Sequence, residues 1–124
     1  VLHPVPDTYF ERTADEALRS DVYAEIFLFE CENEAAGYGL IAKTYSQEAG
    51  GMVWWIEEVY VREAFRSKGI GREFFAYLDK VKGSAVTRMR LEVEEDNTRA
   101  VALYKKLGYK PLEYAQMIKD APLK

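Results

Sequence analysis

The chain has 124 residues, 48% of them hydrophobic and 31% charged, with a formal net charge of −4. This length and apolar content suit one domain with a hydrophobic core and exclude an intrinsically disordered chain. The acidic balance argues against nucleic acid as a partner, because phosphate binding needs a basic face, and it agrees with a cationic substrate.

The residue pattern gives no membrane or secretion signal. No apolar run approaches the roughly 20 residues that a membrane span needs, and the first residues lack the pattern of a signal peptide. Cys31 is the single cysteine, so an intrachain disulfide is excluded. We therefore expect a protein of the reducing cytoplasm without a membrane partner.

The first half of the chain is predicted to contain one short helix and three strands. Residues 1–10 are Pro-rich and predict an extended segment, and residues 13–20 predict a helix with Thr13 as its N-cap. Runs rich in β-branched and aromatic residues then alternate with polar turns. They predict an antiparallel meander of three strands at residues 22–30, 36–45 and 52–61.

The second half begins with a helical period. Apolar residues recur at helical spacing over residues 70–82, and Gly83 ends the predicted helix. Residues 88–94 alternate strictly between charged and apolar side chains, which predicts a half-buried strand. A strand–helix–strand passage of this kind implies a parallel neighbour reached by a right-handed crossover.

The chain then predicts a second helix and a closing element. Asp96 or Asn97 is expected to cap the helix, which ends at Gly108, and residues 109–119 predict one or two closing strands. The order of elements predicts an α/β (α+β) fold, in which helices flank a mixed, mostly antiparallel sheet. We expect residues 1–124 to form a single domain.

The turn before the first of these two helices is glycine-rich and basic. Gly69 and Gly71 permit a close approach of the backbone to a ligand, and the helix N-terminus supplies free N–H groups that can hold phosphate. Formal charge is added at Arg66, Lys68 and Arg72. A tight turn with solvated cations and a phosphate site are both compatible with this pattern, which is neither a Walker loop nor a dinucleotide fingerprint.

Two motifs give the chain a family resemblance. The turn resembles the Q/R-x-x-G-x-G/A signature of the GNAT superfamily of acetyltransferases, and it reads Arg66-x-x-Gly69-x-Gly71. The family's second motif, N-x-x-A-x-x-x-Y-x-x-x-G-F/Y, is matched downstream by Asn97-x-x-Ala100-x-x-x-Tyr104-x-x-x-Gly108-Tyr109. The two motifs have the right order and separation, and the resemblance covers about residues 20–120.

A closer similarity is to the spermidine/diamine acetyltransferase branch. That branch reads G-Y-x-x-x-x-x-T-Y followed by L-E-D-x-x-V, and this chain has Gly37-Tyr38 through Thr44-Tyr45, then Ile56-Glu57-Glu58-Val59-Tyr60-Val61. The resemblance therefore implies an enzyme that transfers an acetyl group to a primary amine of a small molecule by direct attack. A polyamine, an amino acid or a related amine would be the acceptor.

The resemblance also implies acetyl-CoA (coenzyme A) as the cofactor and assigns residues to it. The pyrophosphate would be held at the turn, by Arg66, Ser67, Lys68, Gly69, Ile70, Gly71 and Arg72. The pantetheine arm would pair with the backbone of Val59, Tyr60 and Val61 as an added strand. Asn97 and Ala100 would line the other side of the cofactor, and Tyr104 would lie near the thioester sulfur.

Two alternatives stay open from the sequence. One is transfer to a protein N-terminus or a lysine side chain, and the other is a non-catalytic acyl-CoA-binding module on the same scaffold. Relatives are often dimers, and the aromatic content of 14% is compatible with a homodimer.

Amine chemistry points to two carboxylates and a tyrosine. An alkylamine with a pKa of about 10.4 is almost fully protonated at neutral pH, so the enzyme must bind the cation and then remove a proton. Glu57 and Glu58 are the candidate substrate-binding carboxylates, and Glu57 is also a candidate catalytic residue. Because adjacent strand residues face opposite sides unless a bulge intervenes, we expect only one to face the substrate, and the family pattern favours Glu57. Tyr104 is the candidate general acid for the departing thiolate, although its helical spacing alone would favour a core aromatic.

The chain departs from the family pattern in two places. The family's N-terminal strand and helix are not readable before Thr13, so we expect that they are absent or precede the given sequence. Ser67 stands where many relatives have glycine. His3 is interpreted as a solvated residue, and no cluster has the spacing of metal ligands.

Overall fold

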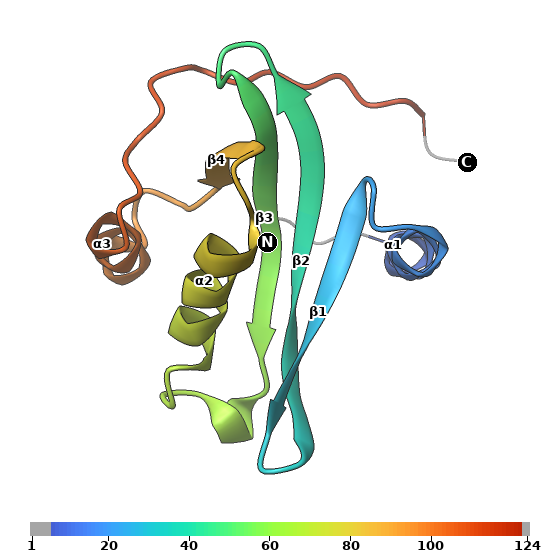
Figure 1. Cartoon of the computed structure of the whole chain (residues 1–124), viewed down its shortest axis with the longest axis vertical. Coiled ribbons are helices and arrows are strands. Elements are labelled where there is room, and N and C mark those ends of the chain that lie inside the picture. Colours follow the sequence, from blue (N-terminus) through green and yellow to red (C-terminus); the bar gives the residue numbers. More distant parts are fainter. Residues whose placement is uncertain (1–5, 123–124) are drawn as a thin grey trace. The chain divides into compact units, whose positions relative to one another are not determined.

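The computed structural model describes residues 6–122 and divides into two units, residues up to Glu92 and residues from Val93 onward. The first unit contains α1 (Asp7–Arg19), β1 (Ala24–Cys31), β2 (Glu34–Ser46), β3 (Gly51–Val61), the short 3-10 helix η1 (Glu63–Phe65), α2 (Ile70–Val81) and β4 (Val86–Leu91) (Figure 1). The second unit contains α3 (Thr98–Lys106). Within residues 6–122, no helix is long and apolar enough to cross a membrane.

Four strands form one sheet in the order β1-β2-β3-β4 (Figure 1). β1 pairs with β2 and β2 with β3 in antiparallel fashion, whereas β4 is parallel to β3. These pairings confirm the predicted meander and the parallel neighbour that follows the α2 crossover. The fold is therefore the predicted mixed, mostly antiparallel sheet flanked by helices.

The hydrophobic core of the first unit lies between α2 and one face of the sheet. Phe74 on α2 packs against two β1 side chains, Phe27 (ring centroids 5.6 Å apart) and Phe29 (5.0 Å). Leu78 on the same helix and Ile41 on β2 are both 0% exposed. The apolar periodicity that predicted α2 is thus the face that this helix buries.

A glycine on β2 makes this packing possible. A Cβ atom built on Gly39 would lie 2.3 Å from the Phe74 ring. We expect Gly39→Ala to lower the free energy of unfolding by about 1–3 kcal/mol through overpacking, as measured by urea denaturation. The double variant Gly39→Ala/Phe74→Leu should lose less than the sum of the two single losses, because the smaller side chain makes room. Strictly additive losses would contradict this explanation.

α1 begins earlier than the sequence pattern predicted. The helix starts at Asp7, so the expected N-cap at Thr13 and the extended conformation of residues 7–10 are wrong. Thr13 lies inside the helix, where its Oγ1 donates to the Tyr9 carbonyl (2.9 Å). Its hydroxyl is therefore satisfied without ending the helix. Residues 1–5, with the interpretation of His3, lie outside the described residues.

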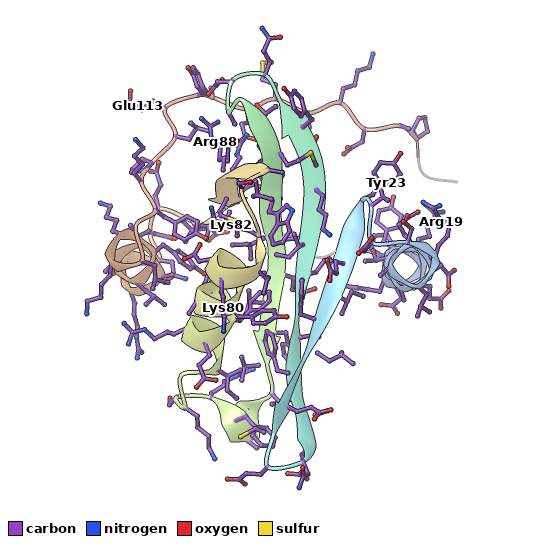
Figure 2. All side chains as sticks on the ribbon, viewed as in Figure 1. Arg19, Tyr23, Lys80, Lys82, Arg88 and Glu113 are labelled. Atoms are coloured by element: carbon purple, nitrogen blue, oxygen red, sulfur yellow. The ribbon has the colours of Figure 1, made fainter. Side chains whose placement is uncertain are left out.

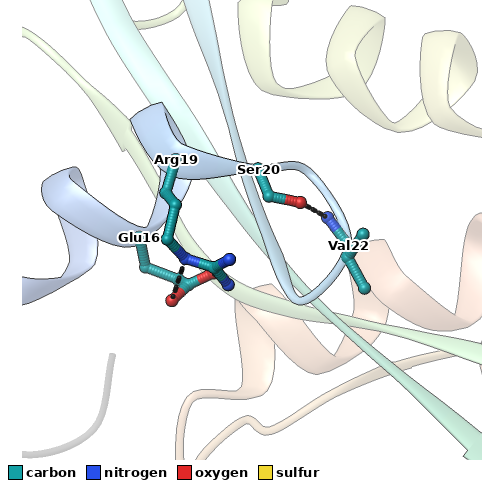
Figure 3. Close-up of polar contacts among 4 residues, drawn as sticks. All are labelled: Glu16, Arg19, Ser20 and Val22. Atoms are coloured by element: carbon teal, nitrogen blue, oxygen red, sulfur yellow. Dashed lines mark hydrogen bonds and ion pairs between the residues drawn. The ribbon is translucent and has the colours of Figure 1, made fainter.

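The end of α1 is held by local polar contacts (Figure 3). Arg19 forms an ion pair with Glu16 one turn earlier, and the Ser20 hydroxyl accepts a hydrogen bond from the Val22 N–H (3.1 Å). α1 lies over the sheet face opposite α2, because alternate β1 side chains line a cavity with α1 (Ile26, Leu28) and pack on Phe74 of α2.

β4 is shorter than the alternating pattern predicted. It ends at Leu91, not at Glu94, because its pairing with β3 stops there. Arg88 on β4 reaches Glu48 in the β2–β3 turn (3.3 Å), and Lys82 at the end of α2 donates to the Val86 carbonyl (3.4 Å). Figure 2 shows the side chains of Arg88 and Lys82 among those of the described residues. The pairing partner, not the side-chain alternation, sets the end of this strand.

The second unit confirms the predicted helix and corrects the prediction that followed it. Asn97 is the N-cap of α3, and its side chain accepts a hydrogen bond from the Ala100 N–H (3.2 Å). Residues 109–119 form no strand, and within the described residues they pair with none. β propensity alone does not make a strand, because an extended segment needs hydrogen-bonded neighbours to be stable.

Candidate active site

β3 has an open edge along its C-terminal half. Its pairing with β4 ends at Ile56, opposite Leu91, whereas its pairing with β2 continues to Val61. Within the described residues, no strand pairs with this part of the β3 edge. Unpaired strand groups of this kind can bind an extended ligand as an added strand.

The direction of the backbone N–H and C=O groups shows which β3 residues point them to the open edge. The Arg62 N–H donates toward β2 (2.7 Å), so strand alternation directs Tyr60 toward β2 and directs Val59 and Val61 toward the open edge. Arg66 supports this assignment, because its Nε donates to the Val61 carbonyl (2.9 Å). Of the three residues predicted to pair with a pantetheine arm, Val59 and Val61 thus present their backbone groups to the open edge.

The N-terminus of α2 presents unused backbone donors. Gly69 is the N-cap, with φ of 80°, and Ser67 also has a positive φ of 65°. Within the described residues, the N–H groups of Ile70, Gly71 and Arg72 have no acceptor. They belong to the first turn of the helix, where the dipole favours a negative charge. Free amides in this arrangement are able to bind a phosphate group.

The flanking cations differ in their contacts. Arg66 is bonded to the β3 backbone, and Lys68 lies over the Phe65 ring with its Nζ 5.8 Å from the centroid. Arg72 is exposed on the first turn of α2. The local charge is therefore positive, although two of the three cations are already anchored to the protein.

Gly71 offers a test of this site that separates ligand binding from stability. A Cβ atom at Gly71 would meet no protein atom within 4 Å, and alanine is the better helix former. We expect Gly71→Ala to keep or raise the melting temperature but to weaken acetyl-CoA binding about tenfold, the loss of roughly one charge-assisted hydrogen bond. Calorimetric titration checks this result, with Asp79→Ala, an exposed change in the same helix, as the control. Unchanged affinity would show that the ligand does not approach this backbone.

A bulge in β3 places two carboxylates on one side of the sheet. Leu40 pairs with Glu58 and Ile41 pairs with Ile56, so Glu57 is an extra residue without a partner on β2. Both carboxylate residues line one cavity. The alternation from which we expected only one of them to face the substrate does not hold here, because the bulge interrupts it.

This cavity lies between α1 and the sheet and has a volume of about 440 Å³, within the usual range for small-molecule sites. Four of its residues come from α1 and six from the first three strands. They are Tyr9, Phe10, Thr13, Ala14, Ile26, Leu28, Tyr38, Leu40, Glu57 and Glu58. The lining is mostly apolar, with the two carboxylates and a few hydroxyls as its polar groups.

Glu58 is held by a tyrosine on the neighbouring strand. The Tyr38 hydroxyl donates to Glu58 Oε1 (2.8 Å). Burial and the hydrogen bond to Glu58 raise the pKa of Tyr38 to about 12, so this hydroxyl stays protonated and remains a donor at neutral pH. The contact fixes the carboxylate in the cavity wall, where it can attract a cation.

Glu57 has a different electrostatic environment. Desolvation, and then the negative charge of Glu92, raises the pKa of Glu57 above its ordinary value. A carboxylate with a raised pKa is a better proton acceptor at neutral pH. The two neighbouring carboxylates therefore suit different tasks, with Glu58 as a fixed anion and Glu57 as a base.

Removing the charge of Glu92 should alter the pH dependence of the reaction. A base must be deprotonated to act, so activity falls as the pH drops through the pKa of Glu57. Glu92→Gln removes one cause of the raised pKa, and we expect the acidic limb of the kcat/KM profile to move to lower pH. High ionic strength should move the wild-type limb in the same direction, because salt screens the repulsion. A limb that moves to higher pH, or not at all, would contradict this assignment.

The second unit carries the remaining predicted residues. Asn97 and Ala100 form the cap of α3, and Tyr104 lies on the same helix with its ring 6.1 Å from that of Tyr109. Burial raises the pKa of Tyr104. Its hydroxyl is therefore protonated at neutral pH, as a general acid must be.

Sequence reasoning missed the α1 wall of the cavity and the Tyr38–Glu58 contact. The signal for α1 was present, since apolar and aromatic residues from Tyr9 onward follow a helical period once the helix is allowed to start at Asp7. The contact of Tyr38 depends on the register of β2 against β3, which no local pattern reveals.

Known proteins are similar to this chain over most of its length. The family model described as Acetyltransferase (GNAT) family matches residues 2–109. The chain belongs to the GNAT acetyltransferase family. Thialysine N-epsilon-acetyltransferase of Bos taurus is 30% identical over 119 residues, which cover 85% of this chain and 69% of the relative. The mouse (Mus musculus) protein of the same name is 32% identical over 115 residues, covering 82% and 67%.

Solved structures show the same fold. A possible acetyltransferase from Clostridium difficile 630 superposes with a TM-score of 0.83 at 21% identity, covering 98% of this chain and 81% of that one. The aminoglycoside N-acetyltransferase AAC(6')-Iy in complex with CoA has a TM-score of 0.72 at 17% identity, covering 93% and 88%. These likenesses show the fold. The family match and the curated relatives make the chain a GNAT N-acetyltransferase with acetyl-CoA as its acyl donor.

The first unit of this GNAT enzyme fits the cofactor. The free amides at the α2 N-terminus suit a pyrophosphate, the space at Gly71 lets a ligand approach the backbone, and the open β3 edge suits an amide-bearing arm. Bound acetyl-CoA supplies the thioester whose acetyl group is transferred. No group of three or more metal-ligating side chains occurs among the described residues.

Proposed function

We propose that this enzyme acetylates the primary amine of a small molecule, such as a polyamine, an amino acid or a related amine. The observation that carries the proposal is the β3 bulge, which aligns Glu57 and Glu58 on a cavity of small-molecule size next to the open β3 edge. The curated relatives named above are thialysine acetyltransferases, which also supports a small amine as acceptor.

The two carboxylates would divide the work on the amine. Glu58, fixed by Tyr38, attracts the ammonium and orients it. Glu57, whose pKa is raised by desolvation and by Glu92, takes the proton that must leave before the amine can attack. The neutral amine then attacks the acetyl carbonyl directly, and a backbone N–H near Val59 stabilises the developing oxyanion.

Tyr104 would act as the general acid in the second unit. Its family motif and its raised pKa, caused by burial, support a role as proton donor to the departing thiolate. Asn97 and Ala100 would line the cofactor on the same helix. A non-catalytic binding module would not need this acid or the carboxylate base.

The experiment is thiol release from acetyl-CoA against polyamines, free amino acids, aminoglycosides and peptides with free N-termini. Release that depends on a small amine is the expected result. Release with peptides alone would overturn the proposal in favour of a protein acceptor. If no amine gives release while acetyl-CoA raises the melting temperature, the non-catalytic binding module is favoured instead.

We also propose a cytoplasmic homodimer that binds neither nucleic acid nor a membrane surface. The single cysteine supports a cytoplasmic location, and the acidic net charge argues against binding nucleic acid. Exposed aromatic side chains such as Tyr23, which is 63% exposed, are available for a subunit contact. Light scattering coupled to gel filtration would give the molar mass, and a monomer across the working concentration range would refute the dimer.

A further inference from the structure

We infer that Arg90, stacked on Trp55, binds a carboxylate of the acceptor, so that the preferred acceptors are amines with a carboxylate at the end remote from the reacting nitrogen. The inference rests on the proposed function and narrows it to amines that resemble amino acids. It depends on where this guanidinium lies on the sheet and on which of its hydrogen-bonding groups are free.

Trp55 and Arg90 lie on the sheet face that carries the carboxylate pair. On β3, Ile56 points into the core and is 7% exposed, so Trp55 and Glu57 on either side of it share the opposite face. Arg90 on β4 pairs with Trp55, and its Cζ lies 3.9 Å from the centroid of the Trp55 ring. The guanidinium therefore lies in the row of the sheet beside the cavity, just outside the cavity lining.

The stacked guanidinium has free donors. Within residues 6–122, the Arg90 side chain forms no hydrogen bond and no ion pair, although it is half-buried. By contrast, Arg88 on the same strand is already paired with Glu48 (3.3 Å). A guanidinium that lies flat on an aromatic ring keeps its fork of N–H groups at its edge, where the fork matches the two oxygens of a carboxylate.

The spacing of the opposite charges suits one acceptor that carries both. At the usual spacings along and between strands, Arg90 is about 8 Å from Glu57 across the sheet. Desolvation and then Glu92 raise the pKa of Glu57, and Arg90 is not among the charges that oppose this shift. The carboxylate and the guanidinium therefore do not neutralise each other. A linear amino acid of the length of lysine can place its ammonium at the first and its carboxylate at the second.

The position of Arg90 argues against a phosphate of the cofactor as its ligand. Arg90 pairs with Trp55 in the part of β3 that β4 closes, whereas the free amides of α2 follow the other end of β3, at Val61. Trp55 lies six residues before Val61, which is roughly 20 Å along a strand. We therefore assign the anion that Arg90 binds to the acceptor.

The test compares ε-aminocaproate with hexylamine, which has a methyl group in place of the carboxylate at the end of the same carbon chain. We expect kcat/KM for ε-aminocaproate to be higher by at least about tenfold, the effect of one charge-assisted contact. Lysine should exceed cadaverine, which is lysine without its carboxylate, in the same way. Equal or lower kcat/KM for ε-aminocaproate would overturn the inference while leaving the acetyltransferase function intact.

Removing the guanidinium should abolish this preference. We expect Arg90→Gln to lower kcat/KM for ε-aminocaproate about tenfold and to change that for hexylamine by less than about twofold. Arg90→Met keeps an unbranched chain over Trp55 and gives the same readout if Arg90→Gln does not fold. Arg88→Gln removes a positive charge from the same strand and is the matched control, in which the ratio of the two amines should not change. Equal losses for both amines would show that Arg90 only covers Trp55, and would overturn the inference.

Failure of the proposed function would be recognised separately. If no amine releases thiol from acetyl-CoA, the carboxylate site is read from binding alone, as the rise in melting temperature caused by ε-aminocaproate or hexylamine. A larger rise with ε-aminocaproate that is lost in Arg90→Gln, or in Arg90→Met, supports the inference. An equal rise with both amines, a larger rise with hexylamine, a rise that survives in the variant, or no rise with either amine contradicts it.

Discussion

Replacing Glu57 by Gln should lower kcat/KM by about 10²–10⁴-fold, the usual contribution of a positioned general base. Glutamine has nearly the same shape but cannot accept the proton of the ammonium. The bulge that places this residue in the cavity does not depend on its charge, so the fold should persist. Steady-state kinetics over a range of pH measure the effect.

The pH profile distinguishes a base from a residue that only binds the cation. The pKa of Glu57 is raised by desolvation and by Glu92, so the wild-type acidic limb should lie at higher pH than an unperturbed glutamate would give. In Glu57→Gln that limb should disappear. The defect should also shrink toward alkaline pH, because more of the amine, with a pKa of about 10.4, is already neutral there. A defect of constant size at every pH would argue against proton removal.

Two matched variants complete this test. Glu58→Gln should mainly raise KM, because it removes the fixed anion that Tyr38 holds and leaves the base in place. Glu30→Gln, at an exposed position on β1 outside the cavity lining, should behave as the wild type. If Glu58→Gln lost kcat while Glu57→Gln lost only affinity, the two roles would be reversed.

Replacing Tyr104 by Phe should lower kcat by about 10²-fold or more, while the Kd for acetyl-CoA stays within a factor of about two. Phenylalanine keeps the aromatic packing against Tyr109 and removes the hydroxyl alone. The measurements are steady-state kinetics and calorimetric titration of the cofactor. Tyr114→Phe, at a position that is 64% exposed on the same unit, is the control and should have no effect.

The alkaline side of the pH profile gives a second readout. A general acid must be protonated, so activity that depends on Tyr104 falls as the pH rises through its pKa, which burial raises above the ordinary value. That alkaline limb should be absent in Tyr104→Phe. Equal losses in kcat and cofactor affinity would indicate a binding role, and no loss in either would indicate a different acid.

Local sequence patterns predicted several elements of the fold. The helical spacing of apolar residues predicted α2 with the same first residue, Ile70, that the structure shows. The glycine-rich turn predicted free amides at the start of that helix, and Asn97 was one of two expected caps of α3. Each of these features depends on residues within one or two turns of chain, so the sequence alone determines it.

Other features were decided by tertiary structure. The first residue of α1, the end of β4 and the absence of a strand over residues 109–119 all depend on which segments find partners. A strand pattern persists only where a neighbour accepts its hydrogen bonds. For this reason the alternation that runs on to Glu94 does not extend β4.

At the site, the pair Glu57 and Glu58 likewise depends partly on sequence and partly on tertiary structure. The residue types and their place on β3 were evident from the sequence, as was the expectation that neighbours on a strand face opposite sides. The register of β2 against β3 leaves Glu57 unpaired, and the resulting bulge brings it to the same cavity as Glu58. Sequence thus determined which groups could do the chemistry. The pairing of strands distant in the chain determined that they act together, because register is a property of two segments and not of either one.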